Sequence, residues 1–275
     1  MIALEALKFT FKNFKKLLPY FILPYFLVTL GTVLGFIPAY SLVKNDYSSI
    51  FIIIGLVGLV LFLASFWSYI VKGAGLYSLI NGLLATGQLL PYSGADRNIE
   101  ERAGKFIKFL LYYALISILI VLSAIAPYLI YAITTNILLT TISSIGIIVF
   151  VAWAFIRLAF VYPAFVFNNF EDAKEPIKYS YELSRGKAVD IFTQGFVLGI
   201  LLQIILTAGS VILTLIMVVL QLSEGVKFAL ESIYNLSFGL LYFATMPALT
   251  TMLYRKYNGS FEHSDWVALM ETQNS

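Results

Sequence analysis

The chain has 275 residues, of which 60% are hydrophobic and 12% are charged, with a formal net charge of +3 and no cysteine. Because about a quarter of the residues in a soluble domain are charged, this composition could not cover a water-facing surface and excludes an ordinary soluble protein. The absence of cysteine excludes disulfides, thiolate metal sites and cysteine nucleophiles.

Six stretches are apolar enough to cross a bilayer as helices, which takes about 20 residues each. In chain order they are residues 17–40, 50–71, 107–133, 138–163, 190–221 and 229–253. They are continuous apolar runs, unlike the alternating segments of a β-barrel, and only helices or closed barrels span a bilayer. The sequence therefore predicts an all-α integral membrane helical bundle, in a single transmembrane domain over residues 1–275. The first stretch is too long for a signal-peptide core, so we expect an uncleaved helix.

Short amphipathic segments precede the first, third and fifth spans, at about residues 3–16, 97–108 and 173–187, and each is typical of a helix that lies in the headgroup plane. Two of these segments contain a similar heptapeptide: EALKFTF at 5–11 and EPIKYSY at 175–181 match in residue type at six of seven positions. The pattern predicts three pseudo-repeats, each an interfacial helix followed by a transmembrane hairpin. Convergence is the alternative, since any interfacial helix favours Lys, Phe and Tyr at such spacing.

The basic residues predict the orientation of the chain. Of its 18 Lys and Arg residues, only Lys44 and Lys227 lie in connections on one side, and Arg157 lies within a span. The others lie in the N-terminal segment, the two long connections and the C-terminal tail. Because cytoplasmic loops carry the excess of Lys and Arg, we expect a multi-pass protein of the cell membrane with cytoplasmic N- and C-termini.

Arg157 is the principal candidate binding residue, because it is the strongly ionised group well inside a span. It could bind an anion such as a lipid phosphate, or it could be tied to a backbone carbonyl or a polar side chain within the membrane. Ser180, Arg185 and Lys187 could complete a corner that binds a lipid headgroup, with Gly186 allowing the chain to bend into the fifth span. The alternative for these residues is a charged surface helix.

Polar and small residues within the spans predict helix packing. Gln194 and Gln203 are expected to form interhelical hydrogen bonds. The Gly-x-x-x-Gly spacings at 31–35 and 195–199 are expected to permit close helix contact, more often inside a multi-span chain than between copies.

Motifs of catalysis are absent from the sequence: there is no nucleotide-binding loop, HExxH, GxSxG or cluster of metal ligands. Asp96 lies among Arg97, Glu100, Glu101 and Arg102, which is typical of a neutralised solvent face. We therefore expect no enzyme activity, no cofactor, no metal and no nucleic-acid partner.

The stretch 154–187 resembles a known family pattern, in which an Arg stands six residues before a Pro-Ala and a Ser stands six residues before a Gly that precedes the fifth helix. Here these residues are Arg157, with Pro-Ala at 163–164, and Ser180 with Gly186. The pattern is similar to that of the membrane domain attached to some bacterial glycerophosphoryl diester phosphodiesterases, and of its stand-alone relatives. The resemblance implies a six-helix membrane protein. It does not imply the phosphodiesterase activity, which belongs to a separate barrel domain of about 250 residues, and the single histidine, His263, lies in a polar tail.

Two functions follow from these features. The first is a non-enzymatic membrane protein that binds or organises membrane lipids through its basic cytoplasmic interfacial helices. The alternative is a transporter or permease-like protein with a path between the repeat units, although transporters usually carry broken helices and paired charges at mid-membrane. Membrane lipids are the expected partners, and the sequence does not indicate a protein partner.

Overall fold

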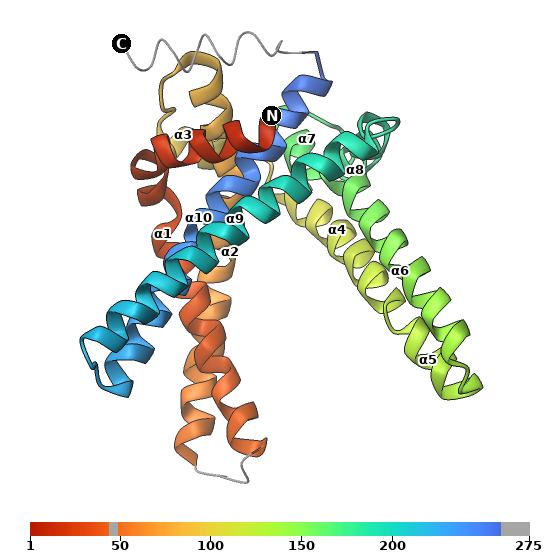
Figure 1. The fold of residues 1–275 in the computed structure, drawn as a ribbon. Helices are drawn as coiled ribbons and strands as arrows, with labels where there is room; N and C mark the ends of the chain where they lie inside the picture. The colour runs from red at the N-terminus through yellow and green to blue at the C-terminus, as the bar shows by residue number, and fades with distance from the viewer. Residues whose placement is uncertain (44–48, 260–275) are drawn as a thin grey trace. The chain divides into compact units, whose positions relative to one another are not determined.

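The computed structural model describes residues 1–43 and 49–259, and the regular structure of these residues is entirely α-helical (Figure 1). In chain order the helices are α1 (Ile2–Val43), α2 (Ser49–Thr86), α3 (Tyr92–Glu100), α4 (Ala103–Ser123), α5 (Ala126–Thr134), α6 (Ile137–Leu158), α7 (Val161–Phe167), α8 (Glu175–Leu183), α9 (Ala188–Val219) and α10 (Glu224–Tyr257). Of the residues discussed above, Lys44 and His263 lie outside the described part of the chain.

Six helical segments of the described chain are long and apolar enough to cross a membrane. They are Ile2–Phe36, Ile50–Thr86, Ala103–Thr134, Ile137–Phe167, Ala188–Val219 and Glu224–Tyr257. Each segment contains all or most of one predicted span. The prediction of an all-α helical membrane bundle is confirmed. The chain is a multi-pass membrane protein. The division into three pseudo-repeats stays a prediction.

Several helix boundaries differ from those expected. α1 is one continuous helix over both the expected interfacial helix, 3–16, and the first span. Pro19 and Pro24 lie within it and lack the N–H that a helix uses, which permits the change of direction along α1 that is visible in Figure 1. The expected interfacial helix 97–108 is divided, because α3 ends at Glu100 and α4 begins at Ala103.

Two spans are interrupted near their ends. The third is divided between α4 and α5, and the fourth between α6 and α7. Pro127 lies in the first turn of α5, and Pro163 lies at the third residue of α7. Proline removes one backbone donor and clashes with the carbonyl four residues earlier, so a new helix begins just before each proline.

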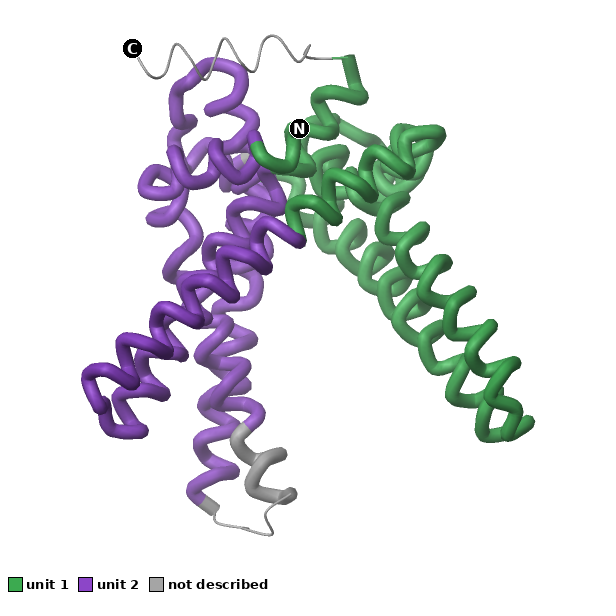
Figure 2. Tube along the Cα trace, viewed as in Figure 1, with its two compact units in different colours: residues 1–4, 101–199, 249–275 green, residues 5–100, 200–248 purple. Residues whose placement is uncertain are grey.

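The chain divides into two compact units, each assembled from separate stretches (Figure 2). Unit 1 contains residues 1–4, 101–199 and 249–275, and unit 2 contains residues 5–100 and 200–248. Whether both belong to one transmembrane domain stays a prediction.

Unit 1 is a long hairpin with short helices at its base. α5 packs on α6, α4 packs on α6, and α8 packs on both α6 and α7. The base is held by buried aromatic rings: the Phe109 and Phe165 centroids lie 4.8 Å apart, and the Phe106 and Phe165 centroids lie 5.1 Å apart. These stacking contacts fix α7 against the start of α4.

Unit 2 contains the close crossing of α1 and α2. A Cβ added to Gly31 would lie 2.6 Å from the backbone N of Phe62, and one added to Gly58 would lie 2.4 Å from the backbone N of Gly35. The expected close packing at 31–35 is therefore confirmed. The expectation for 195–199 is not met in the described residues, because a Cβ on either of those glycines would meet nothing within 4 Å.

α3 is fastened to the rest of unit 2 by a polar cluster. The Tyr20 hydroxyl donates to Asp96 Oδ1 at 2.5 Å, Lys72 forms an ion pair with Asp96, and the Lys72 ammonium lies 4.4 Å from the Tyr20 ring centroid. The Tyr92 hydroxyl also donates to the Lys16 carbonyl at 2.6 Å. The interpretation of Asp96 as part of a solvent face is therefore wrong, because its carboxylate points to partners on α1 and α2.

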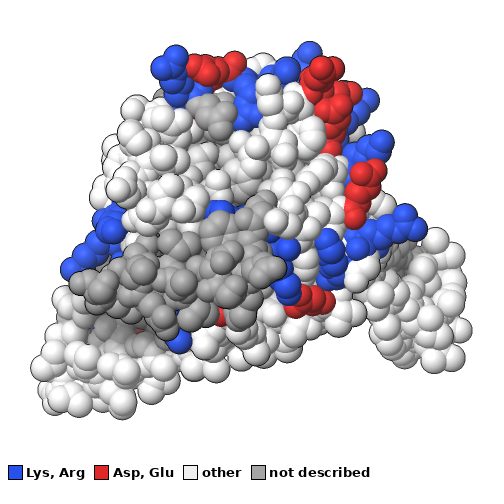
Figure 3. Space-filling view, turned by 90° about the horizontal axis from the view of Figure 1, so that it is seen from above, with Lys and Arg blue, Asp and Glu red and all other residues white. Residues whose placement is uncertain are grey.

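The charges of unit 1 gather at one end. Residues 109–156, which form most of the α4–α6 hairpin, contain no Asp, Glu, Lys or Arg. In the space-filling view this hairpin projects at the right as a white surface, and blue and red side chains lie beside its base (Figure 3). The hairpin is thus suited to hydrocarbon and its base to water and headgroups.

Candidate functional site

The candidate site is built around the break between α6 and α7, in unit 1. Arg157 lies in the last turn of α6, and Phe160 precedes α7 with φ −102° and ψ 8°. The Phe160 N–H donates to Ser180 Oγ at 3.1 Å, and the Ser180 hydroxyl donates to the Arg157 carbonyl at 2.7 Å. Ser180 has no exposed surface. Its hydroxyl therefore satisfies backbone groups at the break and fixes α8 beside Arg157.

The Arg157 guanidinium lies beside two aromatic rings that are in contact with each other. Its central carbon is 4.8 Å from the Tyr181 ring centroid and 5.5 Å from that of Trp153, and the two rings meet edge to face at 6.1 Å. The ring faces carry partial negative charge, so they attract the cation. α6 supplies Trp153 one helical turn before Arg157, and α8 supplies Tyr181.

The hydrogen bonds of Arg157 are long. Nη1 donates to the Tyr181 carbonyl and to Ser184 Oγ, both at 3.4 Å, while the buried Nε has no partner among the described residues. A charge-assisted hydrogen bond is normally about 2.7–2.9 Å. The side chain as a whole is half-buried. The guanidinium is thus held in place by weak contacts that leave donor capacity unused.

The arrangement suits a small oxyanion. A guanidinium presents five N–H donors in a planar fork that matches the oxygens of phosphate or carboxylate, and the described structure pairs Arg157 with no carboxylate. Metal chemistry has no comparable support, because the described residues include no group of three or more His, Asp or Glu that could hold a metal ion.

The other two predicted residues follow α8 but do not join Arg157. Arg185 is exposed, and its side chain forms no hydrogen bond or ion pair with Arg157 or its partners in the described structure. The Lys187 ammonium donates to the Tyr257 carbonyl at 3.4 Å and lies 4.6 Å from the Tyr257 ring centroid. Gly186 has φ +73°, a conformation that favours glycine and lets the chain turn from α8 into α9. The structure therefore brings Arg157 and Ser180 together and places Lys187 at the end of α10.

Tyr257 also fastens the start of α9 to the end of α10. Its hydroxyl and the Lys256 ammonium each lie 2.6 Å from Asp190 Oδ2, and the Gln194 amide donates to Asp190 Oδ1 at 3.2 Å. Gln194 Oε1 in turn accepts the Ala3 N–H at 3.0 Å, which confirms the interhelical bond expected of this residue.

The sequence interpretation missed Arg102. Its guanidinium donates to the carbonyls of Phe165 at 3.1 Å and Asn168 at 2.9 Å from Nη1, and to that of Val166 at 3.3 Å from Nη2. Partial burial lowers the pKa of the Arg102 guanidinium. Arg102 therefore caps the end of α7. The acidic residues beside Arg102 in the sequence suggested an exposed surface charge. Its capping role cannot be read from the sequence, because the carbonyls that it binds are more than 60 residues away along the chain.

Trp153, Tyr181 and Ser184 were also missed as parts of the site. A signal for Trp153 exists in the sequence, since a Trp four residues before an Arg lies on the same helix face. Tyr181 and Ser184 carry no such signal, because their contact with Arg157 crosses from one helix to another.

Comparisons with protein-family models, with curated proteins and with solved structures find no match to this chain.

Proposed function

We propose that this protein binds the anionic headgroups of membrane lipids at Arg157, as a non-enzymatic protein that organises or senses lipids. The observation that carries the proposal is the Arg157 guanidinium itself, held beside Trp153 and Tyr181 by ring contacts and long hydrogen bonds. These hydrogen bonds tie α6 to the Tyr181 carbonyl and the Ser184 hydroxyl, the kinds of partner named by the alternative interpretation of Arg157, but at 3.4 Å they are longer than the usual 2.7–2.9 Å or so of a charge-assisted bond. They therefore leave donor capacity for an anion.

The surroundings of Arg157 support a headgroup as the anion. The α4–α6 hairpin is uncharged from residue 109 to residue 156, so Arg157 comes at the boundary between an apolar hairpin and a charged base. Trp and Tyr concentrate at this level of a bilayer, where one end of the ring is apolar and the other wet. Lys174 lies at the same base, with its ammonium 4.9 Å from the Tyr112 ring centroid. Lipid headgroups at this level would therefore meet basic and aromatic groups at both ends of α8.

The proposal includes an orientation. The basic residues of the sequence favour the cytoplasmic side for the base of unit 1 and for both termini. The inner leaflet carries anionic lipids in many membranes, so the proposed ligand would be present on that side. The family resemblance of residues 154–187 stays a prediction, and it is compatible with a role that involves no catalysis.

Trp153 provides a direct assay of the proposal. The chain has three Trp residues, so Trp67→Phe with Trp266→Phe leaves Trp153 as the only indole. This variant would be reconstituted in phosphatidylcholine vesicles with a rising fraction of anionic lipid whose acyl chains are brominated. We expect the brominated anionic lipid to quench Trp153 more than brominated phosphatidylcholine at the same fraction does.

Two further variants separate the site from the general surface charge. Arg157→Gln should remove the preference for anionic lipid, by about tenfold or more, since a hydrogen bond to a charged group contributes about 1.5–3 kcal/mol. Arg185→Gln removes an exposed charge outside the Arg157 contacts and should leave most of the preference intact. Equal quenching by anionic and neutral lipid, or equal effects of the two variants, would refute the proposed site.

A further inference from the structure

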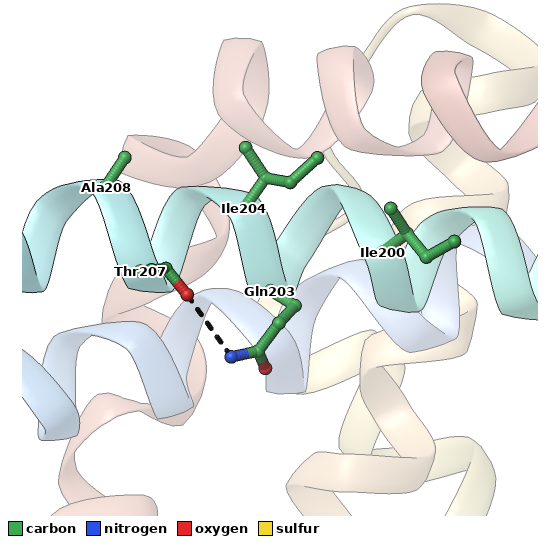
Figure 4. Close-up of a pocket in the computed structure, with 5 residues that line it drawn as sticks. All are labelled: Ile200, Gln203, Ile204, Thr207 and Ala208. Atoms are coloured by element: carbon green, nitrogen blue, oxygen red, sulfur yellow. Dashed lines mark hydrogen bonds between the residues drawn. The ribbon is translucent and has the colours of Figure 1, made fainter.

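Helix α9 carries a groove in unit 2 with polar groups that the described residues leave largely unsatisfied (Figure 4). The groove has a volume of about 440 Å³ and is lined by five residues of α9 that share one face: Ile200, Gln203, Ile204, Thr207 and Ala208. Ile200 and Ile204 are 44% and 58% exposed. None of the five is charged. The groove is therefore an apolar face with an amide and a hydroxyl at its centre.

The hydrogen-bonding capacity of this face is almost unused. Gln203 Nε2 donates to Thr207 Oγ1 at 3.4 Å, the dashed line in Figure 4, and the described structure gives the Gln203 side chain no other partner. The interhelical hydrogen bond expected of Gln203 is therefore not found among the described residues. Thr193 and Thr214 on the same helix donate to carbonyls four residues earlier, at 2.7 and 2.9 Å. Thr207 forms no such bond in the described structure. Its hydroxyl proton and three of the four hydrogen-bonding positions of the Gln203 amide remain available.

Leaving the Gln203 amide without hydrogen bonds is energetically unfavourable at its expected depth in the bilayer. Gln203 lies about 22 Å along α9 from Ala188, close to the middle of the helix, at a rise of about 1.5 Å per residue. No water is present there to satisfy an amide, and hydrocarbon offers no hydrogen bonds. An exposed amide at this level therefore favours a protein partner over lipid chains.

Within unit 2, Tyr234 of α10 contacts α9 on the opposite face. The Tyr234 hydroxyl of α10 donates to the carbonyls of Leu206 at 2.7 Å and Ile205 at 3.2 Å, and it occupies the space where a Cβ of Gly209 would be. At about 100° per residue, Gly209 lies about 180° around the helix from Ile200. The hydrogen-bonded contact between α9 and α10 is thus on the side of α9 away from Ile200, and the residues that line the groove are exposed in the described structure.

We propose that this face of α9 binds the same face of a second copy of the protein, with Gln203 pairing with Gln203 across a two-fold axis. A carboxamide is self-complementary, since it carries both donors and acceptors and two of them can exchange hydrogen bonds. Copies inserted in the same orientation are related by an axis along the membrane normal, so equal residues meet at equal depth. The absence of charge removes repulsion between copies, and the small Ala208 permits close approach.

The absence of native cysteine makes cross-linking a clean test. Single cysteines at Ile200, Ile204 and Ala208, introduced one at a time, would be oxidised in native membranes and scored for disulfide dimers. Ile216→Cys is the matched control, because Ile216 is 47% exposed and lies about 160° around α9 from Ile200. We expect dimers from at least one groove position and none from the control.

The role of the amide is tested in the cysteine-free chain, by measuring dimer dissociation in lipid vesicles by single-molecule photobleaching. Gln203→Met keeps the length of the side chain and removes its hydrogen bonds, and the apparent dissociation constant should rise about tenfold. Gln203→Asn retains an amide and should stay closer to the native value. A monomer at all dilutions, an absence of cross-links in the groove, or a dimer unaffected by Gln203→Met would overturn the proposal.

Discussion

Ser180→Ala tests whether the buried Ser180 hydroxyl holds α8 against the break between α6 and α7, beside Arg157. The native hydroxyl accepts the Phe160 N–H at 3.1 Å and donates to the Arg157 carbonyl at 2.7 Å, with no exposed surface. The substitution leaves the Phe160 N–H buried and without that acceptor. A buried group left unsatisfied costs about 1–3 kcal/mol, and each hydrogen bond lost contributes about 1 kcal/mol.

We therefore expect Ser180→Ala to lower the free energy of unfolding by about 2–3 kcal/mol, which is a factor of about 30–150 in the folding equilibrium. The measurement is equilibrium unfolding of the purified protein in mixed micelles, followed by circular dichroism. Since α8 supplies the Tyr181 ring beside Arg157, the excess quenching of Trp153 by brominated anionic lipid over brominated phosphatidylcholine should also decrease.

Thr193→Ala is the matched control for the loss of a hydroxyl. The Thr193 hydroxyl donates at 2.7 Å to the Val189 carbonyl of its own helix, and the residue is exposed. Such a surface change usually stays within about 0.5 kcal/mol. If Ser180→Ala were no more destabilising than Thr193→Ala, the interpretation of Ser180 as the link between α8 and the α6–α7 break would be wrong.

Three further predictions concern the rest of the structure. Arg102→Met should destabilise the protein by about 2–3 kcal/mol in the same unfolding assay, because the charged donor to three carbonyls at the end of α7 is lost; an unchanged midpoint would contradict this. Asp96→Asn should lower the free energy of unfolding by less than the 3–5 kcal/mol or so that is lost when a fully buried ion pair is broken, since the Lys72 and Asp96 side chains are 24% and 17% exposed. It should increase protease cleavage around α3, and equal cleavage of native protein and variant would count against the role of the cluster. A single cysteine at Thr135, between α5 and α6, should be labelled from the side opposite to one at Arg185 by a membrane-impermeant reagent; labelling from the same side would refute the orientation.

Much of the architecture follows from local properties of the sequence. Apolar runs longer than a bilayer is thick must form helices, because hydrocarbon leaves backbone groups no other partner, and the six spans were predicted on that basis. The helix breaks before Pro127 and Pro163 are local too, since proline cannot continue the backbone pattern. The Gly-x-x-x-Gly spacing at 31–35 predicted close packing correctly, and the same spacing at 195–199 did not, because spacing alone does not say which face meets a partner.

The contacts that define the sites were decided only by the tertiary structure. Arg157 stood out in the sequence because a charge within a span is rare, but its position beside Trp153 and Tyr181 depends on the docking of α8 against α6. Arg102 and Asp96 looked alike as members of one charged segment, yet one caps α7 in unit 1 and the other joins Lys72 in unit 2. The physical reason is range: hydrophobicity and backbone geometry act on residues near in sequence, whereas a hydrogen bond or ring contact requires two distant segments to arrive within a few ångströms of each other.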